Sequence, residues 1–179
     1  QDGTVAIGYN CLGSLTSGDG NTAVGYQALK TEDAGSKNTA IGYQALTTLN
    51  DDDGKNTAVG YNAGTAITTG YLNTIVGTEV ADELLTGFSN TVVGARAFHA
   101  ADGSESRNIA IGTDSMSAVD NNLSTANIAI GVDSLSGGTG AIISNIAIGR
   151  NALNSTGGYA QTGTIAIGED ALTALTSGG

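Results

Sequence analysis

NTAVG at residues 21–25 and NTAIG at residues 38–42 are the stretches that decide the fold of this chain. They begin 17 residues apart, and the longer segments NTAVGYQAL and NTAIGYQAL differ by a single residue. Aligned on the last glycine of the motif, ten such segments follow one another at intervals of 17 to 19 residues. A spacing that drifts this little indicates a fixed structural unit with a loop that tolerates insertions. The ten glycines are Gly8, Gly25, Gly42, Gly60, Gly77, Gly94, Gly112, Gly131, Gly149 and Gly168.

Two positions of the motif are β-branched in every copy. The residue directly before the glycine is Ile or Val, and the residue three before it is Val, Thr or Ile. Such side chains restrict χ1 and favour strands over helices. Between them, on the opposite face of a strand, stands alanine in eight copies, Ile75 in one and Val92 in another. The motif therefore predicts ten short strands that are apolar on both faces.

We expect both faces of these strands to be buried, because apolar residues occupy both. The β-branched columns are expected to face the inside of the chain's own coil. The alanine column is expected to lie against other chains, since small side chains allow a close approach. This arrangement predicts a homotrimer with three copies around a common axis, which a stable monomer in light scattering would refute.

The length of the repeat sets the size of one coil. At about 3.3 Å per residue, 17 to 19 residues give a perimeter of at most roughly 60 Å, enough for two flattened arms and two corners. The predicted fold class is all-β: a parallel β-solenoid of about ten coils, forming one repeat domain over residues 1–179 that we expect to be a segment of a longer fibre. Apolar pairs such as Leu46 and Leu49 leave open whether the return arm is a helical turn or a loosely wound strand.

A polar column precedes the strands. Asparagine stands four residues before the glycine in eight copies, and threonine stands there in the two end copies. Stacked coils would place these amides roughly 4.8 Å apart, where each can donate a hydrogen bond to the next. We interpret the column as a structural ladder that fixes the register of the coils, rather than as ligand-binding residues. Its members are Asn21, Asn38, Asn56, Asn73, Asn90, Asn108, Asn127 and Asn145.

Tyrosine follows the glycine in the first four copies, and other residues replace it in the remaining six. Four tyrosines in register predict an aromatic strip along one corner. Such a strip either covers the rim of an interface or offers a contact surface that stacks on sugar rings. Cys11 lies nearby in a column of small residues and is interpreted as part of the core. The strip consists of Tyr9, Tyr26, Tyr43 and Tyr61.

Composition argues against several classes of partner and site. The chain has 6 Lys and Arg against 17 Asp and Glu, a formal net charge of −11, which disfavours binding to nucleic acid. No apolar run approaches the roughly 18 residues of a membrane span, so no membrane insertion is expected. His99 is the single histidine, which argues against a histidine-rich metal site or a catalytic triad. We therefore predict no enzyme activity, no metal site and no cofactor.

Two local sequences could be mistaken for ligand sites. The three aspartates at residues 51–53 are expected to form a solvated turn rather than a Ca²⁺ site. GGTG at residues 137–140 lacks the lysine of a phosphate-binding loop and is expected to form a corner. The loops at residues 99–107 and 117–126 are the more variable ones, so we expect any receptor contact there.

The repeats NTAVG, NTAIG and NIAIG resemble the SVAIG-type repeats in the head domains of trimeric autotransporter adhesins. The fuller NTAVGYQAL resembles repeats in phage tail fibres and bacterial surface proteins. The resemblance covers residues 4–175. It implies a left-handed parallel β-roll, three chains side by side, and a role in projecting or forming a binding surface. The coils are longer here than in typical adhesin heads, so we expect different corners.

Together these features predict a structural and adhesive fibre segment, from a phage or viral tail fibre or a bacterial surface adhesin. Its expected location is extracellular, on a virion or a cell surface, with a cell-surface glycan or protein as receptor. The alternative is a solenoid that binds ice through its threonine column or carbohydrate through its tyrosines. A polysaccharide-cleaving solenoid ranks third, because no repeat has room for the long insertions that would build a groove.

Overall fold

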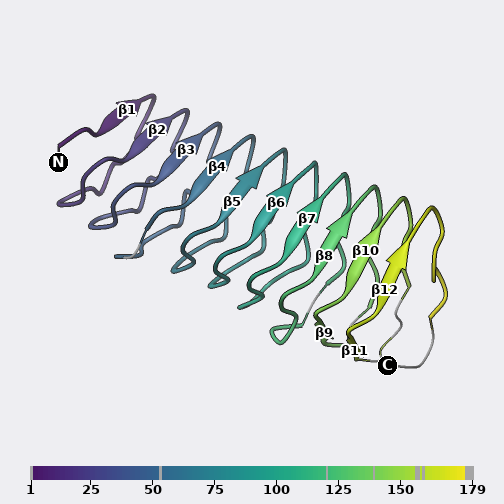
Figure 1. Ribbon diagram of the computed structural model, residues 1–179. Helices are drawn as coiled ribbons and strands as arrows, with labels where there is room; N and C mark the ends of the chain where they lie inside the picture. Colours follow the sequence, from purple (N-terminus) through teal and green to yellow (C-terminus); the bar gives the residue numbers. More distant parts are fainter. Residues whose placement is uncertain are drawn as a thin grey trace.

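Ten short parallel strands lie side by side in the computed structural model, which describes residues 2–52, 54–119, 121–138, 140–155, 158 and 160–175 (Figure 1). Each strand consists of the three residues before a motif glycine, and the register is the one that the glycines predict, as in Thr22↔Thr39. Ten strands joined in this way make about nine turns of the predicted parallel β-solenoid. They are β1 (Val5–Ile7), β2 (Thr22–Val24), β3 (Thr39–Ile41), β4 (Thr57–Val59), β5 (Thr74–Val76), β6 (Thr91–Val93), β7 (Ile109–Ile111), β8 (Ile128–Ile130), β10 (Ile146–Ile148) and β12 (Ile165–Ile167).

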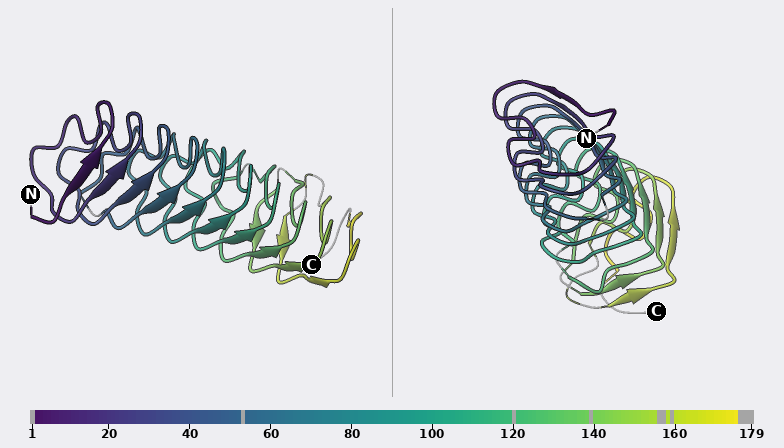
Figure 2. Two further views of the ribbon diagram at one scale, coloured as in Figure 1. Left: turned by 90° about the horizontal axis from the view of Figure 1, so that it is seen from above. Right: turned by 90° about the vertical axis from the view of Figure 1, so that its left-hand side faces the viewer.

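A smaller sheet lies at another corner of the last coils. β9 (Ile142–Ile143) and β11 (Gln161–Thr162) pair in parallel, and isolated bridges extend this pairing to Thr125 and Ser106. Seen along the axis, the coils overlie one another with a gradual rotation (Figure 2). β1 and β12 therefore mark opposite ends of an elongated molecule.

The return arms are built from tight turns, and no helix occurs among the described residues. In every coil, the residues two and four places past the glycine have positive φ, as in Asn10 (54°) and Leu12 (47°). Leucine seldom adopts this conformation. Here the Leu12 N–H donates a hydrogen bond to Ala28 O of the next coil at 3.1 Å, while the Leu12 side chain joins the core. Contacts with the neighbouring coil thus stabilise a backbone that the local sequence disfavours.

The alanine column lies inside the solenoid, so the orientation expected from the sequence was wrong. From Ala23 to Ala166 the residues of this column are at most 2% exposed, and only Ala6 in the first coil faces solvent. The interior of the narrow coil is filled from the return arms by larger residues such as Leu46 and Phe98. A small residue on the strand leaves room for them at normal packing density. The β-branched columns consequently face outward.

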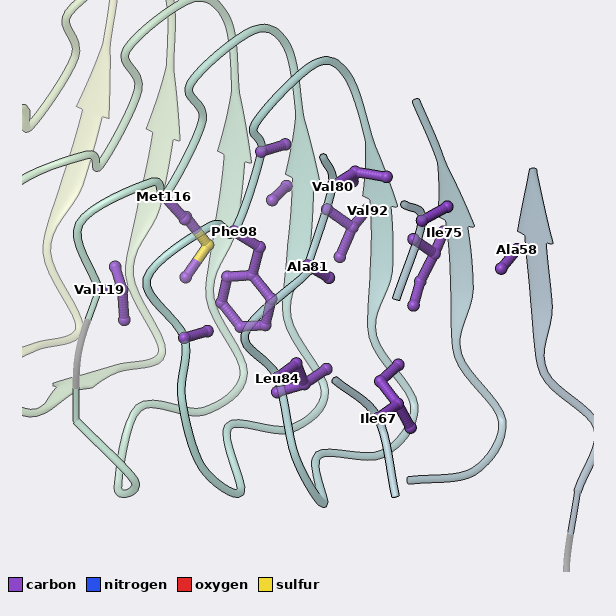
Figure 3. Packing of buried hydrophobic residues seen from close by; sticks show 14 of the residues in the cluster. Ala58, Ile67, Ile75, Val80, Ala81, Leu84, Val92, Phe98, Met116 and Val119 are labelled. Atoms are coloured by element: carbon purple, nitrogen blue, oxygen red, sulfur yellow. The ribbon is translucent and has the colours of Figure 1, made fainter. Parts of the chain in front are cut away.

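Ile75 and Val92, the two larger residues in the alanine column, lie where the return arm contributes a smaller residue than usual. Figure 3 shows Ile75 and Val92 on the side of the strands that faces Leu84 and the other core residues. A Cβ added to Gly64, in the coil before Ile75, would lie 3.2 Å from Ile75 Cδ1. Gly64 stands where most coils have a larger residue, and Ile75 fills that space. Ala81 has the same place in the coil before Val92.

The motif glycines are required by the close approach of neighbouring coils. Gly60 has a φ of 142°, and a Cβ built on it would lie 1.9 Å from Gly77 O. No other residue fits both this conformation and this contact. The glycine therefore ends each strand and allows the chain to turn without separating the coils.

Candidate interaction surfaces

The asparagine ladder is buried and joins one coil to the next. All eight side chains are at most 1% exposed. Asn73 Oδ1 accepts a hydrogen bond from the Asn90 backbone N–H at 2.9 Å, and Asn73 Nδ2 donates to Gly87 O at 2.8 Å. The amide-to-backbone contact recurs along the column and ends where Asn145 Oδ1 accepts from Thr164 N–H at 2.8 Å. These side chains hold the coils in register from within, and they present no surface to a ligand.

The outward β-branched columns form an uncharged face on the ten-stranded sheet. We call the first and last residues of its ten strands the outer face. From β2 to β6 the outer face carries threonine beside Val or Ile, and in the last four strands of the sheet it carries Ile in both columns. Its residues are half-buried in most central strands and more exposed at the ends, reaching 66% at Ile167. None of them is ionisable, in a chain of net charge −11.

The tyrosine strip lies on the surface, at the corner that directly follows the outer face. Its four rings are stacked, with centroids 5.1 to 5.4 Å apart and interplanar angles of 9° to 15°. Their exposed fractions range from 42% at Tyr26 to 69% at Tyr9. Near-parallel rings at this spacing are offset-stacked, which stabilises the corner and leaves part of each ring accessible.

Three pairs of ionisable side chains link neighbouring coils. His99 Nδ1 lies 2.6 Å from Asp82 Oδ1, and this hydrogen bond raises the pKa of His99. Arg96 forms a two-point pair with Asp114, and Arg150 pairs with Glu169. Among the described residues, no group of three or more His, Cys, Asp or Glu side chains is placed to hold a metal ion. The pairs link coils and do not converge on a common site.

Several sequence features lie partly outside the described residues. This holds for Asp53 of the aspartate run, Thr139 of GGTG and Asp120 of the 117–126 loop. Cys11 is half-buried, and its Sγ donates to Gly25 O at 2.6 Å. In the 99–107 loop, Glu105 is buried. Part of the loop that was expected to contact a receptor is therefore buried inside the solenoid.

Two buried carboxylates were missed from the sequence. Glu32 and Glu105 are fully buried, and burial raises the pKa of both. Glu32 Oε1 accepts a hydrogen bond from Gly35 N–H at 2.6 Å. The signal for Glu32 was available, because it stands seven places past its glycine, in the column of Leu49 and Leu84. Glu105 stands in a column where Gly87 and other coils have glycine, which gave no indication of burial.

A second aromatic contact was also missed. Tyr71 stacks on Phe88 with centroids 5.1 Å apart, and the Arg107 guanidinium lies 4.9 Å from the Phe88 ring centroid. The two rings are six places before their glycines, so alignment of that column would have placed them together. This contact joins three consecutive coils at a corner other than that of the tyrosine strip.

Comparison of the chain with protein-family models, curated proteins and solved structures found no match. In the part of the chain that the structure describes, no helix is long and apolar enough to cross a membrane. Function must therefore be inferred from the surfaces described above.

Proposed function

We propose that this chain is a rigid structural and adhesive segment of an extracellular fibre, carried on a virion or a cell surface. Three copies pack side by side, wound left-handed as in the adhesin heads that the repeats resemble. The observation that carries this proposal is the outer face, with twenty β-branched residues in register and none ionisable. Identical chains of charge −11 repel one another least where neither copy presents charge.

The proposed trimer differs in one respect from the trimer expected from the sequence. The β-branched outer face, and not the alanine column, makes the contact between copies. Burying the methyl groups of this long uncharged face between rigid coils stabilises the rod, and the corners stay accessible to a receptor. The role is that of a scaffold that presents binding surfaces, without catalysis.

Light scattering of the purified chain tests this proposal. The expected mass is about 53 kDa, three times the chain mass of 17.6 kDa. Replacing Val76 and Val93 of the outer face together by Asp should reduce the mass to that of one chain, because buried unpaired charges are costly. Thr69→Asp adds one negative charge at an exposed corner and should leave the trimer intact. A wild-type protein that is monomeric at all concentrations would overturn the proposal.

A second candidate function is favoured by the orientation of the threonines. Thr22, Thr39, Thr57, Thr74 and Thr91 lie in register on the outer face, beside a column of Val and Ile. A flat array of hydroxyl and methyl groups is suited to ordering water, and the structure places these threonines on the outside of the coil. Thermal hysteresis of the monomeric chain would support ice binding, whereas a trimer that buries this face would show none.

A further inference from the structure

The corner after the glycine changes its chemistry along the solenoid. In the first four coils, the two residues past the glycine are a tyrosine and an amide, as in Tyr26 and Gln27. In the last six coils the same two places always include a charged residue. Those charged residues are Glu79, Arg96, Asp114, Asp133, Arg150, Glu169 and Asp170. The acidic chain therefore contains one corner segment, residues 9–10, 26–27, 43–44 and 61–62, that carries no carboxylate and no cation.

Polar atoms of this segment are available to a ligand. No hydrogen-bond partner of the four tyrosine hydroxyls lies within the described residues. Gln44 Nε2 donates to Gln27 Oε1 at 3.0 Å. Within the same part of the chain, Gln27 Nε2 and Gln44 Oε1 have no partner, so one donor and one acceptor stand beside the rings. The amide pair is held in place by one hydrogen bond and can make others.

We propose that the tyrosine strip and its amides bind an uncharged, linear glycan that lies along the solenoid axis. This inference rests on the proposed adhesive function and names the class of receptor. Sugar rings combine C–H faces with hydroxyl groups, and the strip offers aromatic carbon beside phenol and amide groups. The ring spacing of 5.1 to 5.4 Å repeats along the axis, which suits a polymer of repeating units.

Charge selects among the possible polymers. A chain of net charge −11 repels anionic polysaccharides, and the segment has no cation to offset that repulsion. The alternative occupant of this corner is a sister chain. The corner directly follows the outer face, which is the surface that a sister chain would cover. The regular exposure of the rings, at least 42% each, and the free polar atoms favour the glycan.

A glycan array that displays both neutral and acidic glycans tests this inference. The variant Tyr26→Thr/Tyr43→Thr is suited to the fold, because Thr78 and Thr113 occupy the same column. Tyr71→Thr, outside the strip, is the matched control. The wild-type protein and the control should bind neutral linear glycans, and the double variant should bind them about tenfold more weakly or not at all. Titration of a soluble hit, followed by tyrosine fluorescence, quantifies the change.

Three binding results would overturn the inference, and one result of the mass measurement would do so as well. They are the absence of any neutral glycan among the hits, unchanged binding by the double variant, and a preference for acidic glycans. If the double variant instead loses the trimer mass, the strip is an interface rim and the inference also fails. The mass of each sample separates the two proposals: a trimer without glycan binding refutes the glycan site alone, and a glycan-binding monomer refutes the trimer alone.

Discussion

Single asparagine side chains hold the register of this solenoid. The Asn73 side chain accepts a hydrogen bond from the Asn90 N–H and donates one to the Gly87 carbonyl. Both residues belong to the following coil and are buried. Removing the amide leaves those two groups without a partner, which is more costly than the loss of a solvent-exposed hydrogen bond. All eight asparagines accept a hydrogen bond from a backbone N–H of the next coil, so the ladder distributes this stabilisation along the axis.

We expect Asn73→Ala to lower the free energy of unfolding by about 2–4 kcal/mol, since two buried groups lose their partner. Chemical denaturation measures the change. Asn50→Ala, at an exposed position, is the control and should have little effect. Equal effects of the two substitutions would contradict the role of the ladder.

Glu105 is a buried acid whose charge opposes folding. Its Oε2 accepts a hydrogen bond from Gly103 N–H at 3.1 Å, and the side chain is fully buried. Burial, with a smaller contribution from the charge of Asp102, raises the pKa of the carboxyl. A pKa that is higher in the folded state stabilises the fold below the unfolded pKa, and this contribution is lost as the pH rises through the folded pKa.

Glu105→Gln is therefore expected to raise the melting temperature at pH 7 and to change it less at pH 3, where the wild-type carboxyl is protonated in both states. Thermal melts at the two pH values measure this difference. The exposed Glu83→Gln is the control for the loss of one negative charge. A larger gain at pH 3 than at pH 7 would show that the charge of Glu105 is not the cause.

The large residue that fills the inside of a coil comes either from the return arm or from the strand that follows it. Most coils combine alanine on the strand with a large residue on the preceding arm, as in Ala58 and Leu46. Ile75 and Gly64 reverse this combination, and a Cβ added at Gly64 would lie 3.2 Å from Ile75 Cδ1. The volume inside the coil is thus kept nearly constant while its individual residues differ.

A double-mutant cycle tests whether these two residues compensate for each other in size. Ile75→Ala alone should destabilise the protein by about 2–5 kcal/mol by opening a cavity, and Gly64→Leu alone by about 1–3 kcal/mol by overpacking. The double variant restores the common combination and should be more stable than Ile75→Ala alone. Urea denaturation gives the three values. Losses that simply add would contradict this compensation.

The strands and their register could be predicted from the sequence, because β-branched columns and a fixed glycine spacing are local signals. The face that each strand buries could not be read from single columns, since alanine and the β-branched residues are both apolar. The buried face depends on the volume available inside a narrow coil. The sequence holds one clue to it: the return arms before Ile75 and Val92 carry the small residues Gly64 and Ala81 where other coils carry a large one. The turn conformation of Leu12 likewise depends on the neighbouring coil.

The surfaces of the whole molecule were predicted in part. The positions of the tyrosine strip and the asparagine column follow from register alone. The exposure of the β-branched columns does not follow from register. These columns face outward because the alanines on the opposite face of each strand point into the coil. An uncharged face on an acidic solenoid favours the side-by-side association that we propose. The proposed fibre role therefore depends on the proposed oligomer.

Thiol labelling at the outer face tests the central claim most directly. Ile111 is 38% exposed in the single chain, and sister chains should cover it in the native protein. In a Cys11→Ala background, Ile111→Cys should react at least about tenfold more slowly than Ala118→Cys, which is exposed on the return arm. Both thiols should react equally fast in denaturant. Native labelling that is as fast at position 111 as at position 118 would contradict the account.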